Sequence, residues 1–395
     1  MATGTGEVQA HADAAAQWLT PKLAEMERVL RPLVEQNSFT ENKAGGDAVG
    51  ELLRALFGGI TGVTAETVRS ERYADHLVFR TEGRADTAPV AMIGHHDTVF
   101  PPGKFEGYRE DGPLRRGPGV LDMKGGLVVI AFALKAIAET VPGGLSALPP
   151  LRIVIVGDEE VGSPEGQGVI RQAIAGAQAA LVFESGRTND AIITRRKGTG
   201  GITVCAHGKA AHAGNAHHEG ANAIWALARF IDRAQALTDY ERGITVNVGK
   251  ISGGQGKNTV PDAAEALADV RFTTRADGEA LVQRLREAAD TAAQAVPGTR
   301  LELKGGIARE PLERSEASAA LMARYAECAR QSGLGAPEAG LIGGGSDAST
   351  SSGMGIPSID GLGPRGKGFH TVDEHIEAAT LVPRAQALAR CLLTF

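Results

Sequence analysis

The sequence LRIVIVGDEEVGS, residues Leu151–Ser163, is the stretch that decides the fold. It begins with a run of mostly apolar, β-branched residues, which predicts a strand buried on both faces of a parallel sheet. The strand ends at Asp158, Glu159 and Glu160, and adjacent glutamates at the end of a buried strand are costly unless a cation meets them. Ligands of open α/β sheets bind at this edge. For one strand alone, the simpler interpretation is that these acidic residues lie at the solvated entrance of a loop.

Two further apolar segments end in the same way. Pro89–Gly94 is followed by His95, and Ala180–Phe183 is followed by Glu184. Because the carboxyl ends of parallel strands meet at one edge of a sheet, these side chains are expected to share a site. Three strands that each end in a metal-capable side chain favour a site over a chance arrangement of loops.

The composition is that of an ordinary globular protein. The 395 residues are 43% hydrophobic and 22% charged, enough for two domains with their own cores. The net charge of −6 and the lack of a basic stripe argue against a nucleic-acid partner. The 52 glycines include clusters that resemble loops of a binding site, at 117–126, 343–345 and 361–368.

Cysteine usage and the N-terminal sequence indicate a reducing compartment. Cys205, Cys328 and Cys391 lack ligand spacing, which excludes a disulfide framework and a thiolate metal site. The N-terminus lacks the basic start and apolar core of a signal peptide. No stretch approaches the roughly 20 apolar residues of a membrane span. We therefore predict a cytoplasmic protein with no membrane partner.

Strands and helices alternate over the first half of the chain, which predicts a doubly wound, mostly parallel sheet. Helical periodicity at 12–36 and 41–57 is interrupted by Pro21 and by Gly45 and Gly46. Strands are expected within 62–81, a loop over Phe100–Gly119, and an apolar helix that ends near Glu139. Asp122 precedes that helix, where a helix N-cap is the simplest interpretation.

The rhythm changes near Thr194 to strand, helix, strand, strand, helix, strand. This βαββαβ order predicts a ferredoxin-like domain inserted into the first one. The expected elements are 201–208, Ala221–Leu237, 243–251, 264–274, Gly278–Ala292 and 300–305. We therefore assign 1–194 and 309–395 to a catalytic domain and 195–308 to an inserted lid or dimerisation domain. In the second part of the catalytic domain, helices are expected at 315–332 and from Leu381.

The residue types at these positions suit a pair of metal ions. If the strand ends lie at one edge of the sheet, imidazole and carboxylate side chains converge on a single site there. These side chains belong to His95, Asp122, Glu159 or Glu160, Glu184 and His370. This mixture favours Zn²⁺, Mn²⁺ or Co²⁺ over Mg²⁺ or Ca²⁺. Two histidines and three carboxylates fit two ions with a bridging carboxylate, which can hold a hydroxide for hydrolysis. The remaining glutamate then suits a general base.

Several motifs occur together in the order of a known family. They are GHHDTV at 94–99, GPGVLDMKGG at 117–126, DEEVGS at 158–163, GKAAHAG at 208–214, NTVP at 258–261 and FHTVDEHI at 369–376. The set resembles the di-zinc aminoacylase and peptidase family, most of all its carboxypeptidase G, or glutamate carboxypeptidase, branch. The resemblance runs from about residue 90 to the end of the chain and includes the inserted domain.

The resemblance implies a role for each site residue. The first metal ion is expected at His95 and Glu184, the second at Glu160 and His370, with Asp122 as the bridge. Asp97 would orient the imidazole of His95, and Glu159 would be the general base. His96 has no role in this scheme and replaces the methionine that is usual there. Ser185 replaces a proline that is usual after the equivalent of Glu184, which leaves the exact substrate open.

The inserted domain would supply the substrate contacts. In relatives, the histidine at the position of His212 donates a hydrogen bond to the oxyanion, often across a dimer interface. Asn258 and Arg271 match the positions that hold the terminal carboxylate of the substrate, and Arg309, where the chain returns to the catalytic domain, is a weaker match. The resemblance therefore implies a homodimer that pairs through the inserted domain.

The resulting hypothesis is a di-zinc hydrolase that cleaves the amide bond to a C-terminal amino acid, glutamate being the first choice. N-Acyl-glutamates and folate-type compounds are the expected substrates, and Co²⁺ or Mn²⁺ could replace zinc. The nearest alternative is a deacylase or dipeptidase of the same family, of the acetylornithine or succinyl-diaminopimelate type. A catalytically silent binding protein on the same fold is an alternative from a different class.

Overall fold

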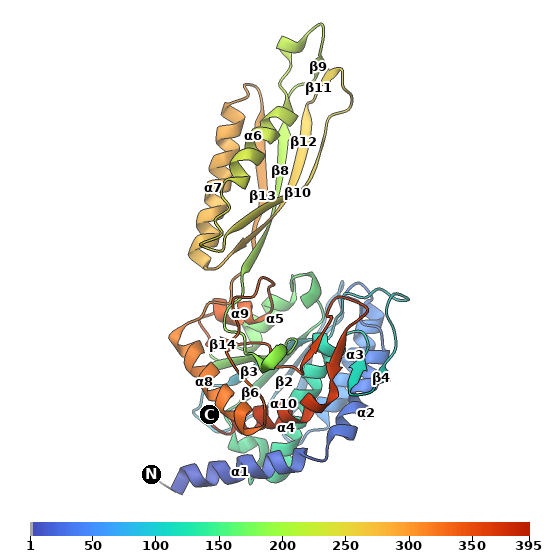
Figure 1. The fold of residues 1–395 in the computed structure, drawn as a ribbon, viewed down its shortest axis with the longest axis vertical. Helices are drawn as coiled ribbons and strands as arrows, with labels where there is room; N and C mark the ends of the chain where they lie inside the picture. Colours follow the sequence, from blue (N-terminus) through green and yellow to red (C-terminus); the bar gives the residue numbers. More distant parts are fainter. Residues whose placement is uncertain (1–2) are drawn as a thin grey trace. The chain divides into compact units, whose positions relative to one another are not determined.

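The computed structural model describes residues 3–395 and divides the chain into two compact units (Figure 1). The first unit takes in the chain up to Arg195, together with Arg314–Leu341 and Ser346–Phe395. The second unit contains Arg196–Glu313 and Ile342–Gly345. It is therefore an insertion, and it includes the segments Arg309–Glu313 and Ile342–Gly345, which the predicted boundaries assign to the catalytic domain.

The first unit is built on a six-stranded sheet. The strand order is β1 (Thr64–Val68), β2 (His76–Arg80), β6 (Leu151–Val156), β3 (Val90–His95), β7 (Ala179–Val182) and β14 (Ser358–Ile359). β3 lies between β6 and β7 and is parallel to both, whereas β2 is antiparallel to β1 and β6. This sheet confirms the predicted α/β fold, and the antiparallel strands lie on one side of it.

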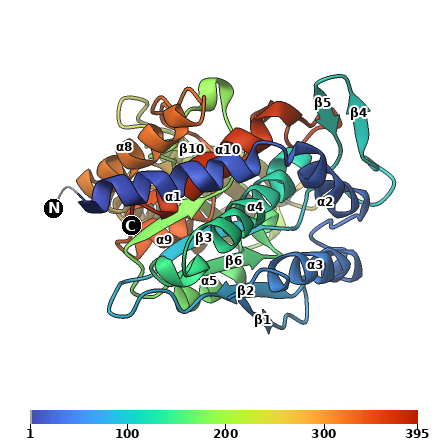
Figure 2. The ribbon, with the colours of Figure 1, turned by 90° about the horizontal axis from the view of Figure 1, so that it is seen from below.

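Helices pack on the sheet and on one another. They are α1 (Thr3–Leu19), α2 (Leu23–Glu35), α3 (Lys43–Gly58), α4 (Gly125–Thr140), α5 (Gly166–Ala173), α8 (Glu316–Gln331), α9 (Ala348–Gly353) and α10 (Leu381–Leu392). α4 is apolar on nearly every side because it is buried among the sheet and other helices. Figure 2 shows α1 lying across α10 and α4.

Two details of the helix prediction were wrong. The first helix begins at Thr3 rather than near residue 12, and it ends at Leu19, just before Pro21. Gly45 and Gly46 do not interrupt α3 but lie buried within it. A Cβ atom at Gly46 would lie 2.5 Å from the Cβ atom of Ala74, so this glycine allows close packing rather than a break.

The predicted loop at Phe100–Gly119 contains a β-hairpin. β4 (Arg109–Asp111) and β5 (Leu114–Arg116) join β16 (His375–Glu377) and β15 (Gly366–Lys367) in a small antiparallel sheet. Such short strands have no periodicity of their own, and their partners lie far away along the chain. Short helical turns connect other elements, at Gly144–Ala147, Thr188–Asp190, His217–Glu219 and Ala378–Thr380.

The second unit has the predicted ferredoxin-like order. It runs β8 (Gly198–His207), α6 (Ala223–Gln235), β10 (Thr245–Gly253), β12 (Ala263–Phe272), α7 (Arg275–Gln294) and β13 (Arg300–Arg309). The sheet order is β10-β12-β8-β13, and both helices cover one face of it (Figure 1). Two short strands, β9 (Ala211–His212) and β11 (Thr259–Val260), form a separate pair. Over residues 3–395, no helix is long and apolar enough to cross a membrane.

Candidate metal centre

The candidate site lies at the carboxyl ends of three neighbouring parallel strands. His95 is the last residue of β3, and Glu184 follows β7. Glu159 and Glu160 begin the short helical turn η3 (Glu159–Val161) after β6. Because β6, β3 and β7 are adjacent and point in the same direction, their ends bring these side chains to one edge of the sheet.

The side chains form two groups that could each hold a metal ion. The ligand atoms of His95, Glu159 and Glu184 lie within 4.8 Å of one another, as do those of Asp122, Glu160 and His370. Thus, all five residues predicted as metal ligands lie in these groups, and Glu159 joins them.

Asp122 lies between the two histidines. Its Oδ1 is 3.4 Å from Nε2 of His95, and its Oδ2 is 3.4 Å from Nε2 of His370. On either side, Nε2 of His95 is 3.8 Å from Oε1 of Glu184, and Nε2 of His370 is 3.0 Å from Oε2 of Glu160. One carboxylate that faces both imidazoles is the arrangement needed for a bridging ligand.

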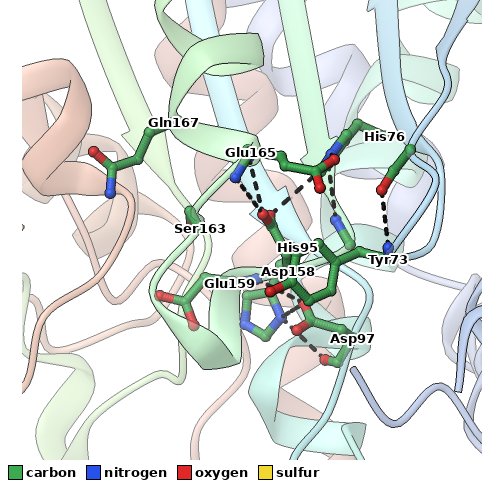
Figure 3. A network of polar contacts seen from close by, with 12 residues as sticks. Tyr73, His76, His95, Asp97, Asp158, Glu159, Ser163, Glu165 and Gln167 are labelled. Atoms are coloured by element: carbon green, nitrogen blue, oxygen red, sulfur yellow. Dashed lines mark hydrogen bonds and ion pairs between the residues drawn. The ribbon is translucent and has the colours of Figure 1, made fainter. Parts of the chain in front are cut away.

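The imidazole of His95 is oriented with Nε2 toward this centre. Its Nδ1 lies 3.1 Å from the backbone oxygen of Asp97 and 3.3 Å from Oδ1 of the same residue, so Nδ1 carries the proton (Figure 3). Nε2 is therefore free to offer its lone pair. Among the described residues, neither buried Nε2 of His95 nor buried Oδ1 of Asp122 makes a hydrogen bond, which fits a metal ion between them.

The charges of the site also call for cations. Burial raises the pKa of Glu160 to about 7. Burial also raises the pKa of Glu184 well above its ordinary value, and the negative charge of Asp122 raises it further. Asp122 and Glu160 raise the pKa of His370 to about 10. Burial opposes ionisation of Asp122, but His370 and His95 outweigh it and lower its pKa. Metal ions at the two groups would compete with the protons that these shifts favour on Glu184 and His370.

Asp97 also holds the turn that carries the paired glutamates. Its Oδ1 accepts a hydrogen bond from the backbone N–H of Glu159, and its Oδ2 accepts one from Glu160, both at 3.1 Å. The hydroxyl of Thr40 donates to Oδ2 at 2.7 Å. One buried carboxylate therefore orients the ring of His95 and fixes the backbone of η3 (Figure 3).

Asp122 does not cap the helix that follows it, so the N-cap interpretation was wrong. It lies in the distorted turn η1 (Val120–Lys124) with a non-helical backbone, at φ −118° and ψ 89°, and the N-cap of α4 is Lys124. The backbone N–H groups around Asp122 instead donate to the buried carboxylate of Glu374. Glu374 had no predicted role, although it lies in the motif that contains His370.

The other polar residues of the two strand-end motifs are structural. His96 is buried, its Nε2 lies 3.2 Å from the backbone oxygen of Asp75, and burial lowers its pKa to about 4. Asp158 accepts hydrogen bonds from the backbone N–H groups of Glu165 and Gly166 at the start of α5, at 2.8 and 3.0 Å (Figure 3). Asp158 therefore stabilises the helix start, whereas Glu159 and Glu160 face the site.

The predicted substrate-binding residues lie in the second unit. His212 is exposed on β9, and its Nδ1 accepts hydrogen bonds from the backbone N–H groups of Gly214 and Asn215. Asn258 immediately precedes Thr259, which pairs with His212.

Of the two predicted arginines, Arg271 is paired within this unit and Arg309 is buried. The guanidinium of Arg271 forms a two-point contact with Asp269, at 2.8 and 2.9 Å. Arg309 is buried at the end of β13, and a Cβ atom at Gly345 would lie 2.9 Å from its Cδ.

Comparisons with known proteins agree with this fold and site. The family described as "Peptidase dimerisation domain", of the M20 peptidases, matches residues 194–297. Carboxypeptidase G2 of Pseudomonas sp. (strain RS-16) is 27% identical over 399 residues, covering 99% of this chain and 94% of the relative. A succinyl-diaminopimelate desuccinylase of Cereibacter sphaeroides is 30% identical over 352 residues, covering 84% and 87%.

A solved structure shares the fold. YxeP of Bacillus subtilis, described as a dinuclear metal-binding peptidase from the M20 family, superposes with a TM-score of 0.70 at 16% identity, covering 94% of this chain and 98% of the other. Fold, site and relatives together define a metal-dependent hydrolase. The chain belongs to the M20 family of metallopeptidases.

Proposed function

We propose that this protein is a two-metal amidase that removes a C-terminal amino acid from an N-acyl or peptide substrate. The observation that carries the proposal is the position of Asp122, whose two oxygens face one ligand group each. His95 and Glu184 would hold the first ion, and Glu160 and His370 would hold the second. Zinc suits this mixture of imidazole and carboxylate, with Co²⁺ or Mn²⁺ as possible substitutes. When bound, the ions lower the pKa of water and polarise the carbonyl group of the substrate.

Glu159 is the proposed general base. Its carboxylate lies next to the ligand atoms of His95 and Glu184, and its backbone is fixed by Asp97. A carboxylate in this position can take a proton from the attacking water and then give it to the nitrogen of the leaving amine. Glu160 is directed to the other ligand group, which separates the roles of the two adjacent glutamates.

His212 is the proposed donor to the oxyanion. Because its Nδ1 accepts two backbone N–H groups, the proton of the neutral ring lies on Nε2, which can donate to a developing negative charge. Its place in a dimerisation domain supports a homodimer, in which His212 could serve the site of the partner.

Arg271 and Asn258 are proposed to bind the terminal carboxylate of the substrate. Asp269 already contacts the guanidinium of Arg271 through both oxygens, so a substrate carboxylate would take the place of another carboxylate. Arg309, which is buried at the end of β13, is proposed as a further aid to this binding.

Glutamate is the proposed amino acid because the relative named carboxypeptidase G2 aligns with nearly the whole chain. N-Acyl-glutamates and folate-type compounds are therefore the first substrates to test. A desuccinylase activity is the second candidate, because a succinyl-diaminopimelate desuccinylase is 30% identical. A cytoplasmic location stays a prediction.

A substrate panel tests the proposal. The zinc-loaded protein is incubated with N-acyl derivatives of glutamate, ornithine and diaminopimelate, and release of the free amine is measured. Preferential release of glutamate is expected. Equal turnover of the glutamate and ornithine derivatives would refute the glutamate preference, and no turnover of any member would favour a silent binding protein.

A further inference from the structure

A single residue holds the chain segment that presents Asp122. Oε1 of Glu374 accepts hydrogen bonds from the backbone N–H groups of Leu121 and Asp122, at 2.9 and 3.0 Å, and Oε2 accepts one from Gly119 at 3.2 Å. The backbone oxygen of Glu374 accepts a fourth bond, from Gly117 at 3.4 Å. The side chain of Glu374 therefore accepts most of the backbone hydrogen bonds that the segment 117–122 donates.

The same residue closes the loop that presents His370. The backbone N–H of Glu374 donates to the oxygen of Thr371 at 3.2 Å, and that of Thr371 donates to Gly368 at 3.0 Å. These bonds form a tight turn in which His370 has a φ of +62°, a conformation that non-glycine residues seldom adopt. The turn restricts where the imidazole of His370 can lie.

The small antiparallel sheet brings these two segments together. His375 of β16 pairs with Arg116 of β5, so the residue before His375 lies beside the residues after Arg116. Glu374 is fully buried there, and its carboxylate meets backbone donors rather than water. A buried carboxylate with several N–H donors is a rigid connection, because loss of any one bond leaves a buried group unpaired.

We propose that Glu374 is a positioning residue. It fixes the positions of Asp122 and His370 relative to each other and so sets the affinity of the protein for the two metal ions. It contacts no proposed reacting atom, and it acts through the backbone of one ligand and the loop of the other. This inference rests on the proposed function, since it takes Asp122 and His370 as metal ligands. Supporting residues of this kind typically contribute about 10- to 100-fold to metal affinity.

The test compares Glu374→Gln and Glu374→Asp with the unaltered full-length protein. Metal is removed by chelation, and the zinc affinities are measured by competition with a chromophoric chelator. The visible absorption spectrum of the Co²⁺-loaded protein is recorded as a second measurement, because it reports ligand geometry without reference to activity. Asp373→Asn is the matched control, since Asp373 is the exposed neighbour of Glu374 and undergoes the same type of change.

We expect both Glu374 variants to bind zinc about 10- to 100-fold more weakly and to show an altered Co²⁺ spectrum. The control should match the unaltered protein in both measurements. If Glu374→Gln does not fold, Glu374→Asp decides the test, because it keeps the charge and shortens the side chain by one methylene.

Unchanged zinc affinity and an unchanged spectrum in the folded variants would overturn the inference, even if their melting temperatures fall. Failure of the unaltered protein to bind two zinc ions would refute the proposed function, and the inference with it.

Discussion

Replacing Asp97 with asparagine tests whether one buried carboxylate supports both halves of the site. In the structure, Asp97 orients His95 and accepts the backbone N–H groups of Glu159 and Glu160. An asparagine amide has only one oxygen, so its NH₂ group must face at least one of these donors. Loss of a hydrogen bond to a charged group costs about 1.5–3 kcal/mol. We therefore expect Asp97→Asn to bind zinc about 10- to 150-fold more weakly, since each 1.4 kcal/mol is a factor of ten.

The assay is a competition titration of metal-free protein with zinc, followed by kcat/KM at saturating zinc. The rate should stay low after zinc is restored, because the backbone of Glu159 is no longer fixed. Asp290→Asn, at an exposed position of α7, is the matched control and should behave as the unaltered protein. Unchanged zinc affinity together with an unchanged kcat/KM would refute the role assigned to Asp97.

Three further predictions follow from the site and the second unit. Asp122 and Glu160 raise the pKa of His370 to about 10 in the metal-free protein, so zinc must displace a proton from its imidazole. The zinc affinity measured by competition titration should therefore fall at least about tenfold per pH unit between pH 9 and pH 7. A zinc affinity that does not change with pH would contradict this prediction. His212→Ala should lower kcat about 10²- to 10³-fold without loss of bound zinc, whereas an unchanged kcat would exclude it as oxyanion donor. Ile251 is 56% exposed on β10, which is an edge strand of its sheet. If the dimer forms along this edge, Ile251→Lys should yield monomers in sedimentation velocity. A dimer that persists in this variant would place the interface elsewhere.

The residues at the strand ends could be predicted because local pattern and parallel topology are enough to place them. A buried strand is evident from its apolar run, and parallel neighbours bring their carboxyl ends to one edge. These two features are enough to place His95, the pair Glu159 and Glu160, and Glu184 at that edge. The ferredoxin-like order of the second unit was accessible for the same reason, because its strands and helices each have clear periodicity.

The environment of Asp122 could not be predicted in this way. A single acidic residue before a helix looks like an N-cap in any sequence, whereas its real environment is set by Glu374, which is far away along the chain. The hairpin β4–β5 was missed for a related reason, since its short strands are completed by β16. Pairings between distant segments leave no local periodicity, so only the structure reveals them.

The contact between Arg271 and Asp269 joins two residues of one strand. The two residues are two positions apart on β12, so their side chains lie on the same face of the sheet. Their contact is therefore compatible with a purely structural role. The family resemblance favours a substrate contact instead. Activity of Arg271→Lys on glutamate and ornithine derivatives would separate them, because loss of a two-point carboxylate contact should raise KM.

Anomalous diffraction at the zinc absorption edge, from crystals of the zinc-loaded protein, tests the central claim most directly. Two peaks are predicted, one beside His95 and Glu184 and the other beside Glu160 and His370, with Asp122 between them. A single peak, or peaks away from these side chains, would contradict the two-metal site on which the proposed function depends.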